Sequence, residues 1–226
     1  MKNATYVVCG CKSWNKRVFD QHMAELPGKW HYIGSKEKLT LKQLKAWQPR
    51  YIFFLHWSWI VPDEILRNFE CINFHMTDLP YGRGGSPLQN LILRGHKKTK
   101  LSAFRMTSTL DAGPMYGKKP LSLAGTAQEI LERSSVLAAE MIKHIAAVQP
   151  QPKEQKGKVV LFERRKPAQS EIPDGLTLKQ LYDFIRMLDG EGYPPAFRKC
   201  GCFRYEYTNA VLYDGRLEAH TRIVPL

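Results

Sequence analysis

The sequence predicts an α/β fold with a Rossmann-like, mostly parallel sheet, followed by a small β-rich C-terminal subdomain. Short β-branched and aromatic segments alternate with helix-forming segments through the first half of the chain. That alternation is typical of parallel strands joined by right-handed crossovers. Toward the C-terminus the segments become closely spaced strands, and Asp214-Gly215 is a hairpin turn signal between two of them.

The elements up to residue 75 follow from apolar runs and their flanking residues. Strands are expected where β-branched, aromatic or aliphatic residues gather. Helices are expected to begin at a capping Ser or Thr, or at a proline, and to end near proline or glycine. The run 51–55 is apolar throughout, as in a strand buried on both faces. The expected strands are 5–9, 29–33, 51–55 and 71–75, and the expected helices are 13–25, 40–47 and 62–67.

The elements after residue 75 follow a different pattern. Proline near the first turn favours a helix over 86–93. Strands are expected at 101–106 and 115–123. Thr126 and Glu129 have capping-box spacing at the start of the longest helix, 126–148.

A polar, proline-bearing segment, 149–158, is the best candidate for a linker. It separates a larger catalytic domain, 1–150, from a small α+β subdomain, 158–226. The elements expected beyond the linker are a strand at 159–162, a helix at 178–188, and strands at 203–207, 210–213 and 217–223.

The composition of the 226 residues is that of an ordinary globular protein, with 43% hydrophobic and 24% charged residues. No apolar run approaches 18 residues, so no membrane span or membrane partner is expected. The N-terminus lacks the apolar region of a signal peptide, which favours a cytoplasmic location. The net charge of +13 points to an anionic partner without saying which one. The acid-free basic stretch 79–110 is alternatively a solvated face.

The five cysteines do not indicate a disulfide framework or a metal site. An odd count in a cytosolic chain argues against disulfides. Two Cys-Gly-Cys pairs are closer than the usual zinc-ligand spacing. We therefore expect no metal, and interpret the cysteines as small core or turn residues.

The residues with the clearest chemical pattern are Asn73, His75 and Asp111. Asn73 and His75 lie on one face of the strand 71–75, at the carboxyl edge where open α/β sheets bind ligands. An amide and an imidazole suit the stabilisation of an oxyanion on a carbonyl. Asp111, in a turn, is a carboxylate able to hold the imidazole and accept a proton. An Asn-x-His pair is also common without any chemical role.

A glycine-rich loop, Gly82-Arg83-Gly84-Gly85-Ser86-Pro87, precedes the helix 86–93. Its backbone amides and the helix N-terminus suit an anion. The Lys-Ser/Thr of a nucleoside-triphosphate P-loop is missing.

Three blocks together resemble the N10-formyltetrahydrofolate-dependent formyltransferases. They are Asn73-x-His75-x-Thr77-x-Leu79-Pro80, then 83–87 (Arg-Gly-Gly-Ser-Pro), then 110–114 (Leu-Asp-Ala-Gly-Pro). The segments 162–167, 185–189 and 192–197 extend the resemblance to the amino-sugar and methionyl-tRNA branches. The resemblance implies the formyltransferase fold, with N10-formyltetrahydrofolate as co-substrate.

The resemblance also implies a mechanism and a folate site. A neutral amine of the acceptor attacks the formyl carbon directly, Asn73 and protonated His75 stabilise the oxyanion, and Asp111 orients His75 and takes the amine proton. Positioning the two bound substrates supplies much of the rate. The tryptophans of the folate site are alternatively core residues. The implied folate-binding residues are Trp57, Trp59, Ile60, Leu110, Ala112, Gly113 and Met115.

For the acceptor, the expectation is a nucleotide-linked 4-amino-4,6-dideoxy sugar, UDP-linked as in pseudaminic acid biosynthesis. It rests on the compact length and on the segments 164–167 and 192–197. The expected acceptor-binding residues are Thr77, Asp78, Arg83, Gly84 and Gly85, where the family often has Ser for Thr77 and Leu for Asp78.

Other acceptors stay open. Methionyl-tRNA is disfavoured because the part after the linker is short and only weakly basic, so nucleic acid is an unlikely partner. A peptide-synthetase-type formylation domain is a further alternative. Glycinamide ribonucleotide is disfavoured by the C-terminal appendage and by Asp78. A non-catalytic RNA-binding module would need none of the three catalytic residues.

Overall fold

The computed structural model describes residues 4–226. They form two compact units that are interleaved along the chain. The first unit contains the chain up to Arg83, then Lys100–Leu121 and Glu132–Leu161. The second contains Gly84–Thr99, Ser122–Leu131 and Phe162–Leu226. The division of the chain into domains at 150 and 158 stays a prediction.

The first unit is built on a six-stranded sheet with the strand order β2-β1-β3-β4-β6-β7. Parallel pairing joins β1 to β2 and β3, and β3 to β4, whereas β6 pairs with β4 in the antiparallel direction. The predicted mostly parallel sheet is therefore confirmed. Its strands are β1 (Thr5–Gly10), β2 (Lys29–Ile33), β3 (Tyr51–Leu55), β4 (Cys71–His75), β6 (Lys98–Arg105) and β7 (Met115–Ser122).

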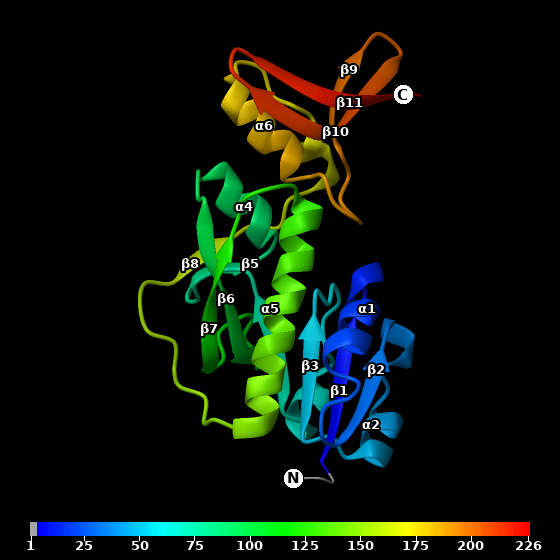
Figure 1. Cartoon of the computed structure of the whole chain (residues 1–226), viewed down its shortest axis with the longest axis vertical. Helices are drawn as coiled ribbons and strands as arrows, with labels where there is room; N and C mark the ends of the chain where they lie inside the picture. Colours follow the sequence, from blue (N-terminus) through cyan, green and yellow to red (C-terminus); the bar gives the residue numbers. More distant parts are fainter. Residues whose placement is uncertain (1–3) are drawn as a thin grey trace. The chain divides into compact units, whose positions relative to one another are not determined.

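Helices cover both faces of this sheet (Figure 1). Val7, Cys9 and Phe54 on one face belong to a buried apolar cluster that includes residues of the helices α2 and α3. On the other face, the hydroxyl of Tyr6 donates to the carbonyl of Ala146 in α5. The helices are α1 (Ser13–His22), α2 (Leu41–Trp47), α3 (Asp63–Asn68) and α5 (Ala127–Val148), with a 3-10 turn at Lys36–Lys38.

Two details of the first unit differ from the sequence prediction. Helix α1 is capped from Lys12, whose backbone N–H is accepted by Asn15 Oδ1 at 3.0 Å, and it ends at His22 rather than near 25. A short strand β5 (Tyr81–Gly84) pairs with β8 (Val160–Phe162). The glycine-rich sequence of β5 has none of the β-branched residues that normally indicate a strand.

The second unit holds an antiparallel sheet with the order β11-β10-β9. Its strands are β9 (Ala196–Cys200), β10 (Phe203–Tyr213) and β11 (Arg216–Pro225), and its helices are α4 (Pro87–Leu93) and α6 (Leu178–Arg186), with a 3-10 turn at Pro167–Ser170. The hairpin at Asp214-Gly215 is confirmed. The two strands predicted over 203–213 are one strand, interrupted by an irregularity between Thr208 and Val211.

Strand β9 was not predicted, because the two prolines immediately before it, Pro194 and Pro195, are typical of a turn rather than of the start of a strand.

Among residues 4–226, no helix is long and apolar enough to cross a membrane.

Candidate active site

His75 is the last residue of β4 and is buried, with 7% of its surface exposed. Its Nε2 lies 2.7 Å from the carbonyl oxygen of Gly82. A carbonyl only accepts, so Nε2 carries a hydrogen and donates it. This bond fixes the plane of the imidazole and leaves Nδ1 facing the opposite direction.

Asp111 faces the Nδ1 side of that ring. Its Oδ2 lies 3.8 Å from His75 Nδ1, and its side chain is 6% exposed. The backbone of Asp111 is left-handed, with φ +52°, a conformation that Asp tolerates better than most residues. The predicted pair of His75 and Asp111 is thus brought together, at ion-pair distance but beyond a direct hydrogen bond.

Asn73 precedes His75 by two residues in the same strand and is half-buried. Its backbone is opposite Phe54 of β3 and Phe104 of β6. Alternation places its side chain on the same face as that of His75. Asn73 and His75 therefore share one face of β4 near its carboxyl end, and Asp111 lies beside His75.

The predicted folate loop follows β3. Trp57 packs against the buried cluster under α2 and α3, as the core-packing alternative expects, and its ring is 5.7 Å from that of Phe54. Its Nε1 is nevertheless buried without a hydrogen-bond partner. Trp59 meets Trp57 edge-on at 4.9 Å, and Ile60 is 91% exposed. This loop thus combines exposed apolar surface with one unsatisfied donor.

The second predicted folate segment surrounds Asp111. Leu110 is largely exposed, whereas Ala112 and Met115 are half-buried. Gly113 is buried, and a Cβ at this position would lie 1.9 Å from the carbonyl oxygen of Arg105. Glycine is therefore required here by the close approach of two backbone segments.

Two residues predicted to bind the acceptor have protein partners instead. Thr77 is fully buried and its hydroxyl donates to the Gly82 carbonyl at 3.4 Å. Asp78 accepts hydrogen bonds from Lys118 and, at 3.0 Å, from Lys100. Partial burial raises the pKa of Asp78, but these two lysines outweigh it and hold the pKa below its ordinary value. The negative charge of Asp78 is thus balanced by two lysine ammonium groups.

The glycine-rich loop packs closely against residues 162–164. A Cβ on Gly84, whose φ is +110°, would lie 2.3 Å from the carbonyl oxygen of Phe162, and one on Gly85 would lie 2.4 Å from Cβ of Arg164. The Gly85 amide donates to the Phe162 carbonyl at 3.0 Å. The Gly85 N–H is therefore already bonded within the chain, and anion binding by this loop stays a prediction.

Arg83 is held by a residue outside the predicted site. Its Nε and Nη2 donate to Oε1 of Gln155 at 3.2 and 2.8 Å. Gln155 lies in the segment predicted as a linker, and it also donates to the carbonyls of Asp111 and Gly113. No sequence signal distinguished Gln155 from its polar neighbours.

A second polar cluster, also not predicted, is centred on the half-buried His56, directly after the end of β3. His56 Nδ1 is 3.2 Å from Asn15 Nδ2, and Nε2 is 3.0 Å from Ser134 Oγ. Burial first, and the charge of Lys12 second, lower the pKa of His56 to about 4. His56 is therefore neutral near pH 7, and it anchors the start of the loop that carries Trp57.

The cysteines behave as small core and surface residues. Cys9 and Cys71 are buried and free. Burial raises the pKa of the Cys71 thiol to about 12, with a smaller contribution from Glu70. Within the described part of the chain, no three His, Cys, Asp or Glu side chains are grouped as metal ligands.

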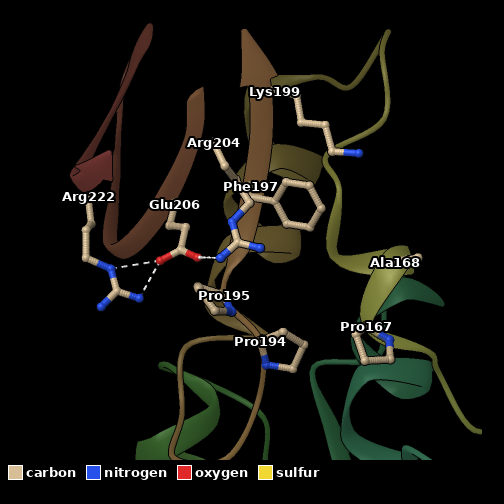
Figure 2. Close-up of a pocket in the computed structure, with 9 residues that line it drawn as sticks. All are labelled: Pro167, Ala168, Pro194, Pro195, Phe197, Lys199, Arg204, Glu206 and Arg222. Atoms are coloured by element: carbon tan, nitrogen blue, oxygen red, sulfur yellow. Dashed lines mark hydrogen bonds and ion pairs between the residues drawn. The ribbon is translucent and has the colours of Figure 1, made fainter. Parts of the chain in front are cut away.

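A separate hollow of about 480 Å³ lies in the second unit (Figure 2). There the buried Glu206 carboxylate forms ion pairs with Arg204 Nη2 at 2.6 Å and with Arg222 Nη2 at 2.5 Å. The ring of Phe197 lies 5.4 Å from the Arg204 guanidinium. The hollow is lined by Pro167, Ala168, Pro194, Pro195, Phe197, Lys199, Arg204, Glu206 and Arg222.

Comparison with known proteins identifies the family. The formyl transferase family model matches residues 15–145. A model described as the C-terminal domain of methionyl-tRNA formyltransferase matches residues 167–224. The chain therefore belongs to the formyl transferase family, as its three sequence blocks indicated. This family uses N10-formyltetrahydrofolate, so the expected co-substrate is confirmed at the level of the family.

Two relatives bear the name methionyl-tRNA formyltransferase. A solved structure from Clostridium thermocellum is 45% identical, with a TM-score of 0.95, covering 98% of this chain and 99% of that one. A curated protein from Wolinella succinogenes is 29% identical over 67% of this chain and 51% of its own length. The chain spans about half the length of this curated relative.

A 4-N formyltransferase from Francisella tularensis has a TM-score of 0.69, covering 88% of this chain and 93% of that one. It is only 15% identical, which shows a shared fold and nothing about the acceptor.

These comparisons correct the predicted acceptor. The expectation of a nucleotide-linked sugar, with nucleic acid as an unlikely partner, is wrong, because the relatives of higher identity are named methionyl-tRNA formyltransferases. The error came from length. A short C-terminal part predicts a poor tRNA-binding platform, yet the Clostridium thermocellum chain has the same extent and carries the name methionyl-tRNA formyltransferase.

Proposed function

We propose that the chain transfers the formyl group of N10-formyltetrahydrofolate to the α-amino group of methionyl-tRNA. The observation that carries this proposal is 45% identity to the Clostridium thermocellum protein over nearly the full length of both chains. The match of residues 167–224 to the methionyl-tRNA formyltransferase C-terminal domain supports it. The net charge of +13 suits a polyanionic acceptor.

The transfer breaks the bond between the formyl carbon and folate N10 and forms an amide with the amine nitrogen. The amine loses a proton and N10 gains one. Asp111, 3.8 Å from His75, is placed to take the amine proton. At this separation His75 Nδ1 makes no direct hydrogen bond to Asp111, so this edge of the ring is available to the formyl oxygen.

The hydrogen bond to Gly82 fixes which ring nitrogen of His75 faces the substrates. Nε2–H donates to the Gly82 carbonyl, so Nδ1 carries a second hydrogen only in the imidazolium form. The Asp111 carboxylate lies beside Nδ1, with Oδ2 at 3.8 Å. We assign to the imidazolium, together with the Asn73 amide, the stabilisation of negative charge on the formyl oxygen.

The residues around the folate loop fit the co-substrate. A pterin needs apolar contacts and hydrogen-bond partners. Trp59, Ile60 and Leu110 offer exposed apolar surface, and Trp57 Nε1 is a buried donor without a protein partner. We therefore keep the folate-binding roles of Trp57, Trp59, Ile60 and the 110–115 segment, with Gly113 contributing through its backbone.

For the acceptor we keep Arg83 as the binding residue with the best support. Gln155 holds its Nε and Nη2, and Nη1 lies outside those two bonds. Thr77, Asp78 and the glycines 84 and 85 shape the surrounding chain through the contacts described above.

The test is formylation by the full chain with N10-formyltetrahydrofolate and four acceptors: initiator methionyl-tRNA, elongator methionyl-tRNA, glycinamide ribonucleotide and a UDP-4-amino sugar. The product is measured as base-released N-formylmethionine or as a mass gain of the small acceptors. We expect formylmethionine from methionyl-tRNA, and none with His75→Ala at matched enzyme concentration. Formyl transfer to another acceptor, with none to either tRNA, would overturn the proposed acceptor and leave the family assignment intact.

A further inference from the structure

The segment 149–158, predicted as a linker, is hydrogen-bonded to residues 110–115, which we call the Asp111 loop. Met115 and Lys153 exchange backbone hydrogen bonds, 2.6 Å from the Met115 amide and 2.8 Å from the Lys153 amide. Both residues belong to the first compact unit, as do Asp111, Arg83 and Gln155. Lys153 is two residues before Gln155, so this pair of hydrogen bonds fixes the backbone position from which the Gln155 side chain extends.

The Gln155 amide uses its full hydrogen-bonding capacity on two functional segments. Its Nε2 donates to the carbonyls of Asp111 and Gly113, at 2.8 Å each. Its Oε1 accepts from Nε and Nη2 of Arg83. Two hydrogens and two lone pairs are all that a glutamine amide offers. The flipped amide would set NH₂ against a guanidinium and oxygen against two carbonyls, so the network permits only one orientation.

The Asp111 loop needs such a bond donor. Asp111 has a left-handed backbone, and Gly113 packs directly against the Arg105 carbonyl. In this conformation the carbonyls of Asp111 and Gly113 point toward the same nitrogen of Gln155. Two converging carbonyls repel unless a donor lies between them. Replacing the donor therefore favours a different backbone conformation at Asp111 and a different carboxylate position.

We propose that Gln155 is a positioning residue that fixes the Asp111 carboxylate against His75 and, through its other end, fixes the Arg83 guanidinium. The inference rests on the proposed function, because it takes its meaning from the roles of Asp111 and Arg83 in formyl transfer. Gln155 touches neither substrate in this account. It links the proton-accepting loop to the acceptor-binding arginine through one side chain.

Two substitutions separate the two ends of the Gln155 amide. Gln155→Glu keeps an acceptor for Arg83 but removes both donors and sets a carboxylate against two carbonyls. Gln155→Lys keeps a donor for the carbonyls but removes the acceptor and places a second cation beside Arg83. Gln151, an exposed glutamine of the same segment, gives the matched controls Gln151→Glu and Gln151→Lys.

In the full chain, we expect Gln155→Glu to lower kcat by on the order of 10- to 100-fold, the effect of misplacing a catalytic group by about 1 Å. KM for methionyl-tRNA should change little in that variant. Gln155→Lys should mainly raise KM for methionyl-tRNA while keeping most of kcat. Both Gln151 variants should behave as wild type.

The NMR signals of the His75 ring nitrogens provide a readout that needs no turnover. They should shift in Gln155→Glu and stay unchanged in Gln151→Glu. If wild type formylates no tRNA, the proposed function fails, and this measurement still decides whether Gln155 fixes the Asp111 loop. Wild-type kcat together with unchanged His75 signals in Gln155→Glu would overturn the inference, as would equal losses in the two Glu variants.

Discussion

Nδ1 of His75 lies 3.8 Å from Oδ2 of Asp111, while Nε2 of the same ring lies 2.7 Å from the carbonyl oxygen of Gly82. Both ring nitrogens therefore face oxygen atoms that accept hydrogen bonds. Only the 2.7 Å contact is a direct hydrogen bond, and in it Nε2–H is the donor. Nε2–H is thus committed to the Gly82 carbonyl, and Nδ1 is the ring nitrogen that faces the Asp111 carboxylate.

Removing either member of this pair should abolish most of the activity. His75→Ala and Asp111→Ala should each lower kcat by about 10²-fold or more, because an oxyanion donor or a proton acceptor is lost. Asp111→Asn keeps the side-chain shape without the charge and should lose activity to a similar degree. The measurement is single-turnover formation of formylated product. Near-normal turnover in any of these variants would reject the assigned roles.

A surface histidine controls for nonspecific effects of losing an imidazole. His144 is exposed on α5, and His144→Asn should retain wild-type turnover.

Gly113→Ala should damage the site through the backbone. The added Cβ would lie 1.9 Å from the Arg105 carbonyl oxygen, so one of the two segments has to move. We expect a loss of about 1–3 kcal/mol in the free energy of unfolding, typical of overpacking, and a lower kcat because Asp111 is two residues away. Gly117→Ala in β7 is the matched control, since a Cβ there meets nothing within 4 Å. Equal behaviour of the two variants in denaturant titration and kinetics would contradict this account.

Local patterns sufficed for much of the fold and for the pairing of His75 with Asp111. Hydrophobic runs and caps predict β1 to β4 because each is decided by residues adjacent in sequence. The role of Gln155 could not be predicted from the sequence. A glutamine in a polar, proline-bearing segment gives the same sequence pattern whether it is solvated or hydrogen-bonded to a catalytic loop. The ion pairs of Asp78 could not be predicted because Lys100 and Lys118 approach it only in the folded chain. Tertiary partners of polar side chains leave no periodic signal.

The buried carboxylate of Glu206 should stabilise the second unit. It is 4% exposed and receives hydrogen bonds from Arg204 and Arg222. Glu206→Ala leaves two arginines without their shared partner, and the cost of breaking a buried pair is about 3–5 kcal/mol, an upper bound here because the arginines are partly exposed. Arg222→Ala should cost less than about 1 kcal/mol, since that side chain is largely exposed. Denaturant titration of the full chain checks the order, and a larger loss for Arg222→Ala than for Glu206→Ala would contradict it.

His56 should make the protein sensitive to mild acid. Its neutral ring accepts at Nδ1 from Asn15 and donates from Nε2 to Ser134, so a proton on Nδ1 would oppose the Asn15 amide. Burial and, to a smaller extent, Lys12 lower its pKa to about 4 in the folded chain, against an ordinary value of about 6.5. Between these values the unfolded chain binds a proton that the folded chain does not, so stability falls as the pH drops from about 6.5 to about 4. The loss amounts to at most about 3 kcal/mol for a shift of this size.

Asn tolerates the left-handed backbone at this position, where φ is 48°, so His56→Asn removes the titrating group with little strain. Free energies of unfolding measured from pH 7 to pH 4 should decline more steeply for wild type and His144→Asn than for His56→Asn, and parallel curves for all three would show that His56 does not carry the effect.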